Sequence, residues 1–172
     1  MKKLRLLLVD DETEFIETLA DRLKLRDLEA SIAHNGEEAL SLVEEEEPDV
    51  IVLDVKMPGI DGIEVLRRVK QAHPNVEIII LTGHGTEKEE KAARSLGVFD
   101  FMKKPADIDA LVPRIRNAFR QRMKKLERMA MAVAFAEAGE FDTAKEMMED
   151  EMGTSGSPKA ILAKIRDPDQ ED

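Results

Sequence analysis

The sequence predicts an α/β fold: a doubly wound, five-stranded parallel sheet followed by a C-terminal α-helical extension. Over residues 1–106, short apolar runs rich in branched residues alternate with helical patterns. This alternation is typical of buried parallel strands that are joined by crossover helices. From Asp107 onward the apolar runs stop and one long helical pattern begins, which indicates the extension.

Each of the five apolar runs is bounded by turn signals, as a buried strand should be. The predicted strands are Leu4–Val9, Glu29–Ala33, Val50–Asp54, Val76–Leu81 and Val98–Met102. In a doubly wound sheet, ligands bind outside the carboxyl ends of the strands. The residues that follow these runs are therefore the first candidates for a functional site.

Four helical patterns separate the strands. Three of them place apolar residues on one face: Phe15, Ile16, Leu19 and Leu23 in the first, Ala39, Leu40 and Val43 in the second, and Ile63, Leu66 and Val69 in the third. Asn35 is the expected N-cap of the second helix. The fourth, "TEKEEKAARSLG", is polar and is expected to stop at Gly97.

Composition excludes several classes of protein. The chain has 172 residues, no Cys and three well-separated His, so disulfides and thiolate sites are excluded and a zinc site is not expected. Its net charge of −11 argues against a nucleic-acid-binding protein. Arg5 interrupts the apolar start "MKKLRLLLV", and no run is long enough to span a membrane. We therefore expect a cytoplasmic protein with no membrane partner.

Five polar or charged side chains follow the ends of four predicted strands: Asp10 and Asp11, Asp54, Thr82 and Lys104. The fold should bring them to one edge of the sheet. Three carboxylates form an oxygen-rich site for a hard divalent cation, by default Mg²⁺. A carboxylate beside Mg²⁺ can attack phosphorus, and the Thr82 hydroxyl and the Lys104 cation suit the remaining phosphoryl oxygens.

Each of these residues also has an ordinary structural interpretation when taken alone. Asp10 and Asp11 would be a solvated strand end, Thr82 a turn hydroxyl and Lys104 a surface lysine. Phe101 would be a core or edge-strand aromatic residue. Their placement after successive strand ends favours a common site over these separate interpretations.

Four motifs resemble the receiver domain of bacterial two-component response regulators. They are "LLLVDDE", "VIVLDVKMPGIDGIEVL", "IIILTGHG" and "FDFMKKPAD", and the resemblance covers about residues 3–120 in order. It implies the flavodoxin-like receiver fold. It also implies a response regulator of a phosphorelay that catalyses only its own phosphorylation and dephosphorylation, and is otherwise not an enzyme.

By this resemblance, Asp54 accepts a phosphoryl group from a sensor histidine kinase or a phosphotransfer protein. Asp10, Asp11 and Asp54 would hold Mg²⁺, with Asp11 and Asp54 as the most direct ligands. The backbone carbonyl of Lys56 would be a further ligand.

The resemblance also implies roles for residues around the acceptor. Thr82 and Lys104 would contact the phosphoryl group, and Phe101 would be an aromatic switch that follows Thr82. The Lys104–Pro105 peptide bond would be cis. Lys56 and His84 would flank the path of an attacking water.

Two other functions compete with this interpretation. Haloacid-dehalogenase-like phosphatases also place an aspartate nucleophile after the first strand, but they need Asp-x-Asp, and here Glu12 stands where the second acid belongs. The second is a receiver-like interaction scaffold that acts without phosphorylation. The complete set of site residues argues against the scaffold.

We divide the chain into a receiver domain at residues 1–120, a helical extension or hairpin at 121–152, and a flexible linker, short helix and acidic tail at 153–172. Val112, Phe119, Leu126 and Val133 recur every seven residues, and Arg122 breaks a neighbouring stripe. Near-heptad spacing suits a partner helix, so a homodimer is one expected output.

The segment "AFAEAGEFDTAKEMMED" indicates two helices that are separated at Gly139. It weakly resembles one tetratricopeptide-type hairpin, and a single repeat cannot bury its own apolar face. The extension contains no complete DNA-binding module. The alternative output is therefore contact with a downstream protein.

Overall fold

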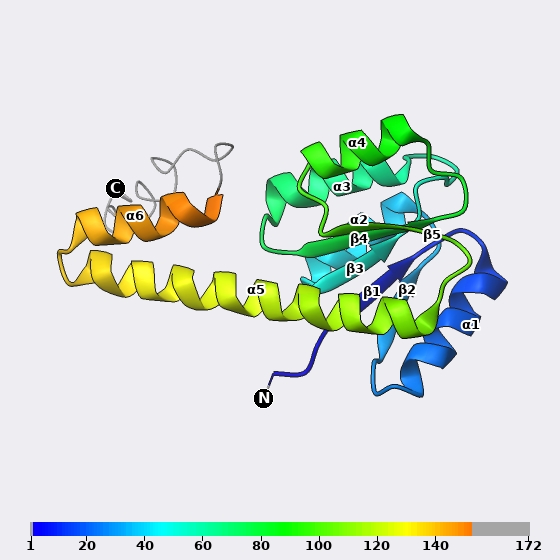
Figure 1. Ribbon diagram of the computed structural model, residues 1–172, viewed down its shortest axis with the longest axis horizontal. Coiled ribbons are helices and arrows are strands. Elements are labelled where there is room, and N and C mark those ends of the chain that lie inside the picture. The colour runs from blue at the N-terminus through cyan, green and yellow to red at the C-terminus, as the bar shows by residue number, and fades with distance from the viewer. Residues whose placement is uncertain (1, 153–172) are drawn as a thin grey trace. The chain divides into compact units, whose positions relative to one another are not determined.

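The computed structural model describes residues 2–152 and confirms the predicted fold class (Figure 1). Five parallel strands form one sheet in the order β2-β1-β3-β4-β5. The strands are β1 (Leu6–Val9), β2 (Ala30–Ala33), β3 (Val50–Leu53), β4 (Glu77–Thr82) and β5 (Asp100–Lys103). The helices are α1 (Thr13–Lys24), α2 (Gly36–Glu45), α3 (Gly62–Ala72), α4 (Glu87–Ser95), α5 (Ile108–Glu137) and α6 (Phe141–Met152).

Helices cover both faces of the sheet (Figure 1). One apolar core packs β-strand side chains against α2, α3 and α4, and the other packs them against α1 and the first part of α5. β1, β3 and β4 are buried along their whole length, as expected of central strands in a parallel sheet. Helices therefore cover both faces of the sheet, so a functional site is expected at the ends of the strands.

Local sequence signals set several helix ends. Asn35 caps α2 as predicted, because its side chain accepts a hydrogen bond from the Glu38 N–H. Asp61 caps α3 in the same way, by accepting from the Glu64 N–H. Gly97 follows α4 with a φ of 83°, a conformation that glycine adopts without a steric cost.

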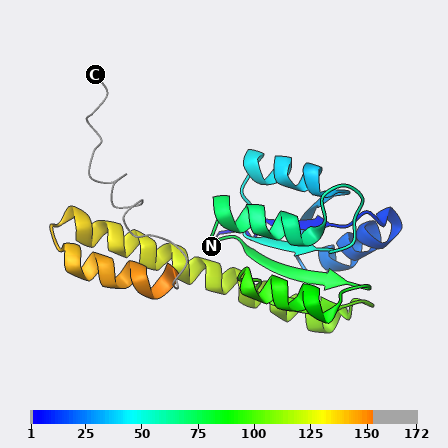
Figure 2. The same ribbon diagram turned by 90° about the horizontal axis from the view of Figure 1, so that it is seen from above.

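The chain divides into two units, residues 1–122 and 123–172, and α5 contributes to both. In the described part of the second unit, α6 runs alongside the C-terminal part of α5 (Figures 1 and 2). Gly139, with a φ of 85°, lies in the turn between them. The predicted linker, short helix and tail at residues 153–172 lie outside the described residues.

The seven-residue stripe is only partly available to a partner. Val112 is buried in the receiver core, and Phe119 packs against the same core. The first half of the stripe therefore packs on the receiver domain itself. Arg122, which breaks the neighbouring stripe in the sequence, is itself buried.

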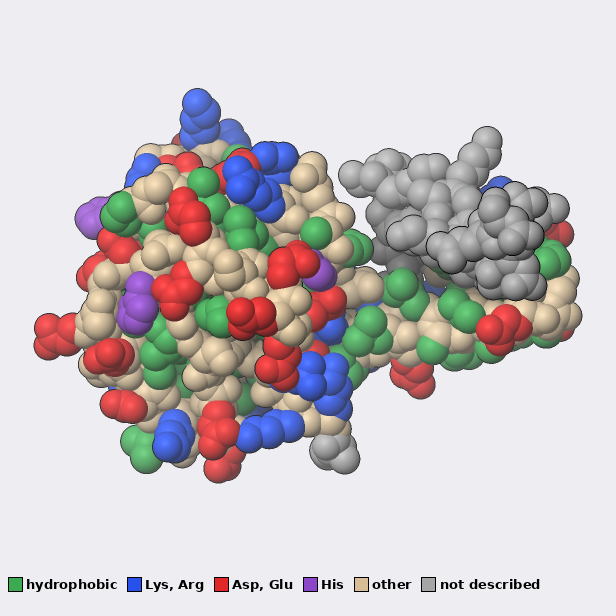
Figure 3. Space-filling view, turned by 180° about the vertical axis from the view of Figure 1, so that it is seen from behind, with side chains coloured by type: hydrophobic (Ala, Val, Ile, Leu, Met, Phe, Trp, Pro, Cys, Tyr) green, Lys and Arg blue, Asp and Glu red, His purple; other side chains and the backbone are tan. Residues whose placement is uncertain are grey.

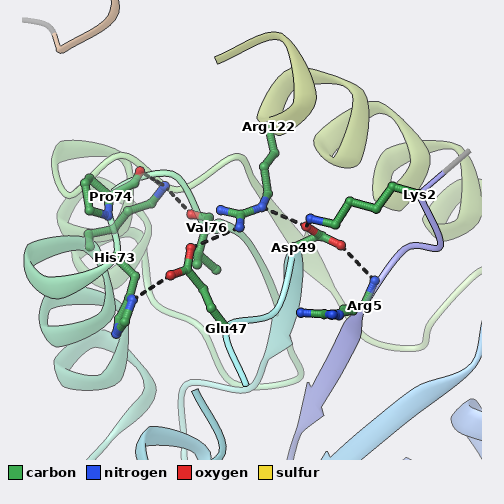
Figure 4. Close-up of polar contacts among 9 residues, drawn as sticks. Lys2, Arg5, Glu47, Asp49, His73, Pro74, Val76 and Arg122 are labelled. Carbon is green, nitrogen blue, oxygen red and sulfur yellow. Dashed lines mark hydrogen bonds and ion pairs between the residues drawn. The ribbon is translucent and has the colours of Figure 1, made fainter. Parts of the chain in front are cut away.

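Arg122 is the centre of a buried polar cluster (Figure 4). Its Nε lies 2.8 Å from Asp49 Oδ1 and its Nη2 lies 3.0 Å from Glu47 Oε1. Asp49 also accepts hydrogen bonds from the Lys2 ammonium group at 3.1 Å and the Arg5 N–H at 2.9 Å. Burial alone would raise the pKa of the Asp49 carboxyl, but these donors lower it below its ordinary value.

The molecular surface mixes both signs of charge. On the face shown in Figure 3, Asp and Glu side chains are interspersed with Lys and Arg. Within residues 2–152, no helix combines the length and the apolar character needed to cross a bilayer.

Replacing Arg122 by Gln should lower the free energy of unfolding by about 3 kcal/mol, because it leaves the fully buried Asp49 carboxylate without its guanidinium partner. Urea unfolding at pH 7.5 measures this loss. The matched control is Arg120→Gln, which removes an exposed charge two residues earlier and should cost less than about 0.5 kcal/mol. Equal losses in the two variants would contradict the assignment of Arg122 as a buried anchor.

Candidate functional site

The register of the sheet brings two predicted carboxylates together. Val9 pairs with Leu53 at the carboxyl ends of β1 and β3, so Asp10 and Asp54 follow at the same edge. The Asp54 N–H donates to the Val9 carbonyl at 2.9 Å, which continues the ladder one residue beyond the strands. Both side chains are nearly inaccessible, at 2% exposed for Asp10 and 4% for Asp54.

The pairing of β4 with β5 adds the predicted hydroxyl and cation. Thr82 pairs with Lys103, and the Lys104 N–H donates to the Thr82 carbonyl at 2.9 Å. Thr82 is the last residue of β4, one position later than the predicted end of that strand. Four side chains from distant parts of the sequence therefore meet at one edge, as the strand-end argument predicted.

Lys104 is held among acidic side chains. Its Nζ lies 2.6 Å from Asp10 Oδ2, 3.1 Å from Glu12 Oε1 and 3.9 Å from Asp54 Oδ2. The same ammonium group lies 4.2 Å from the centre of the Phe15 ring, in a cation–π contact. Lys104 thus supplies the positive charge that the two buried carboxylates need in this arrangement.

Burial sets the protonation of these carboxyls. It raises the pKa of Asp54, and the adjacent Asp10 charge raises it further. Burial likewise raises the pKa of Asp10, against the hydrogen bond from Lys104. For Lys104, burial alone would lower the pKa, but the hydrogen bond to Asp10 and the neighbouring charges raise it. At both carboxyls, burial therefore outweighs the donors and the cation that would lower the pKa.

Backbone groups fix the orientation of both carboxylates. The Val55 N–H donates to Asp54 Oδ1 at 2.9 Å, and the Glu12 N–H donates to Asp10 Oδ1 at 2.9 Å. In each group the other oxygen, Oδ2, faces Lys104. A carboxylate held in this way meets an electrophile with little loss of conformational freedom.

Carboxylate oxygens of Asp10, Glu12 and Asp54 lie within 4.8 Å of one another. Oxygen donors at this spacing fit a hard divalent cation such as Mg²⁺. The predicted ligand Asp11 is exposed and lies outside this group, and Lys56 also has an exposed side chain. The metal-ligand roles of Asp11 and of the Lys56 carbonyl remain predictions.

Glu12 was not among the predicted site residues. It precedes α1 directly and lies two residues after Asp10, where the backbone turns from strand to helix. That turn brings the Glu12 side chain back toward Lys104. The only signal in the sequence is the acidic run "DDE" itself, which does not reveal which acid points inward.

The loop after β4 packs on the predicted switch residues. A Cβ atom added to Gly85 would lie 2.6 Å from the Phe101 ring and 2.7 Å from the Thr82 methyl group. The loop therefore packs directly against both side chains. Phe101 is buried, and the Lys104–Pro105 peptide bond on the neighbouring loop is cis.

Comparison with known proteins identifies the family. The family model of the response regulator receiver domain matches residues 6–116. The chain belongs to this family. The family resemblance that the four motifs indicated is thereby confirmed, and the haloacid-dehalogenase-like alternative is set aside.

Individual relatives agree with the receiver assignment. The chain is 31% identical over 134 residues to "Response regulator MprA" of Mycobacterium avium, a match that covers 78% of this chain and 59% of that relative. The chain therefore spans about three fifths of the length of this curated relative.

Solved structures of receiver domains match over most of their length. A response regulator from Chloroflexus aurantiacus is 34% identical with a TM-score of 0.65, and the match covers 69% of this chain and 99% of that one. A CheY-like receiver domain protein from Methanospirillum hungatei has a TM-score of 0.69 at 24% identity, over 72% of this chain and 99% of that one, and shows the fold alone.

In metal-free buffer at pH 7.5, Asp54→Asn should raise the thermal midpoint of the receiver domain by a few degrees. The folded-state pKa of Asp54 is raised, so holding this group ionised costs stability at any pH above that pKa. As pH falls through the folded pKa, the native carboxyl takes up a proton and regains stability, so the advantage of the variant should shrink.

Calorimetry of both proteins between pH 7.5 and pH 4.5 with a chelator present makes this measurement. Asp11→Asn is the control, because it removes an exposed carboxylate of the same run. A variant no more stable than the native protein at pH 7.5, or an advantage that grows on acidification, would contradict the burial argument.

Proposed function

We propose that this receiver domain accepts a phosphoryl group on Asp54 in a Mg²⁺-dependent transfer from a sensor histidine kinase or a phosphotransfer protein. Phosphorylation would then switch partner binding or self-association. One observation carries the proposal: Asp54 is a buried, backbone-oriented carboxylate whose second oxygen, Oδ2, faces Lys104 beside Asp10. A buried carboxylate whose charge is not fully compensated by nearby donors and cations is typical of a reactive group rather than a structural one.

The proposed transfer is a single displacement at phosphorus. An oxygen of the Asp54 carboxylate forms a bond to phosphorus while the P–N bond to the donor histidine breaks, and the imidazole nitrogen keeps the electron pair. Thr82 lies beside Asp54 and can donate its hydroxyl to a phosphoryl oxygen, and Lys104 can bind another. Hydrolysis by water would release phosphate and restore the carboxylate.

The acidic group at the sheet edge supports a metal requirement. Asp10, Glu12 and Asp54 supply three neighbouring oxygen donors, and the proposed further ligands are Asp11 and the Lys56 carbonyl. When bound, Mg²⁺ neutralises charge between the acceptor and an incoming phosphoryl group. The raised pKa values of Asp10 and Asp54 are consistent with a site that favours a divalent cation.

The proposed output begins at Thr82 and Phe101. Because the Gly85 backbone packs on both side chains, a shift of Thr82 toward the phosphoryl group would move the loop that leads into α4. We propose that the resulting surface change alters contact with a downstream protein or with a second copy of the chain. A receiver-like scaffold that acts without phosphorylation is the competing function.

Incubation with acetyl phosphate and Mg²⁺ should add one phosphoryl group per chain, and intact-mass analysis detects it. Asp54→Asn should abolish this addition because it removes the nucleophilic oxygen, and a metal chelator should abolish it in the native protein. Asp61→Asn is the control, since it changes an exposed acid on the same loop and keeps an N-cap residue for α3.

Two results would separate the candidate functions. Undiminished addition to Asp54→Asn would remove Asp54 from the mechanism. No addition to the native protein with either acetyl phosphate or a phosphorylated histidine donor would favour the scaffold.

A further inference from the structure

One ion pair joins the loop after the acceptor to α4. Lys56 Nζ lies 2.6 Å from Glu89 Oε1, across 33 positions of the sequence. The Lys56 side chain is 53% exposed and the Glu89 side chain is 20% exposed. Neither side chain belongs to the acidic group at the sheet edge.

The two carboxylate oxygens of Glu89 have different partners: Oε1 contacts Lys56, and Oε2 contacts the start of α4. Oε2 accepts the Thr86 N–H at 2.8 Å, and the Thr86 hydroxyl accepts the Glu89 N–H at 3.2 Å. This reciprocal arrangement is a capping box, which stabilises the first turn of a helix. Lys56 therefore holds the same side chain that closes the first turn of α4.

The other side of this turn is linked to the phosphoryl site by packing. Thr86 follows Gly85 directly, and Gly85 lies against Thr82 and Phe101. The first turn of α4 is thus linked to the loop after β4 and, through the Lys56–Glu89 ion pair, to the loop after Asp54. The second connection depends on charge.

Lys56 is the basic residue nearest to Asp54 in the sequence. It is the single basic residue in the segment 54–62, and it lies two residues after the acceptor. Lys104, the proposed phosphoryl ligand, lies 3.9 Å from Asp54 Oδ2 and is also paired with Asp10 and Glu12, whereas Lys56 is paired with Glu89. An exposed ion pair is weak, and a phosphoryl group carries more negative charge than the single carboxylate of Glu89, so it can compete for Lys56.

We propose that Glu89 is a positioning residue that holds Lys56 away from the acceptor in the resting protein, and that a phosphoryl group on Asp54 draws Lys56 from Glu89. Loss of Lys56 leaves the first turn of α4 with its capping box alone, so that turn becomes less stable. This inference rests on the proposed function of Asp54. It adds an electrostatic connection to α4 that is separate from the movement of Thr82.

Glu89→Gln tests the proposal with little disturbance of the helix. Glutamine can replace glutamate in a capping box, so the substitution removes the charge and keeps the cap. Glu90→Gln is the matched control, because Glu90 lies next to Glu89 in α4 and pairs with Arg94 on the same helix at 3.0 Å. Both variants lose one negative charge from the first turn of α4.

The first measurement is the rate of phosphorylation by acetyl phosphate below saturation. Glu89→Gln should raise the rate about threefold, through a lower KM, because the released Lys56 attracts the anionic donor. Glu90→Gln should leave the rate within about 1.5-fold of the native value. With Lys56→Gln in the background, Glu89→Gln should have no further effect, since Glu89 acts through Lys56.

Equal rates for Glu89→Gln and Glu90→Gln would overturn the proposal. So would an effect of Glu89→Gln that persists in Lys56→Gln, because it would show that Glu89 acts on the donor directly.

The second measurement is hydrogen exchange in residues 87–90 of the resting, unphosphorylated protein. Glu89→Gln should exchange faster there than Glu90→Gln, and a beryllofluoride mimic should speed exchange in the native protein but not in Glu89→Gln. If the native protein takes up no phosphoryl group, the proposed function fails, while exchange in the resting protein still decides the role of Glu89. Equal exchange in both resting variants would overturn that role.

Discussion

The structure depends on one constraint: Asp10 and Asp54 are buried side by side at the carboxyl edge of a parallel sheet. Two adjacent carboxylates in a low-dielectric site repel, so a cation has to lie between them. Lys104 supplies that charge at 2.6 Å from Asp10, and the fold brings it there from a loop 94 positions away in the sequence. The raised pKa values of both carboxyls show that compensation by Lys104 is incomplete. This residual cost is what makes the site suited to a divalent cation.

A buried carboxylate lies at each end of β3, and the two differ in the direction in which their pKa values are shifted. Asp49 precedes the strand and accepts hydrogen bonds from Arg122, Lys2 and the Arg5 backbone, which together lower its pKa. Asp54 follows the strand, and its pKa is raised. A fully compensated carboxylate stabilises the fold, whereas an under-compensated one is available for chemistry. We therefore assign an anchoring role to the first and propose the acceptor role for the second.

The sequence predicted the sheet and the meeting of Asp10, Asp54, Thr82 and Lys104, because strand periodicity and parallel pairing determine both. It predicted the Asn35 cap because asparagine is a preferred residue at a helix start. It did not predict that Glu12 rather than Asp11 joins the acidic group, since that depends on the backbone turn between β1 and α1. Arg122 looked like a flaw in an apolar stripe because its partner, Asp49, lies 73 positions away. The Lys56–Glu89 pair was missed for the same reason, although "TEKE" contains the capping-box pattern.

The central claim is that the under-compensated carboxylate of Asp54 is the group that takes up phosphorus. Borohydride trapping tests it most directly: one hydride from borohydride displaces phosphate from the acyl carbon of an aspartyl phosphate, and a second hydride and a proton convert the resulting aldehyde to the alcohol of homoserine. Peptide mass spectrometry after treatment with acetyl phosphate, Mg²⁺ and borohydride then locates the modified position. We expect homoserine at position 54 and at no other aspartate. Homoserine at Asp10 or Asp11, with Asp54 unchanged, would contradict it.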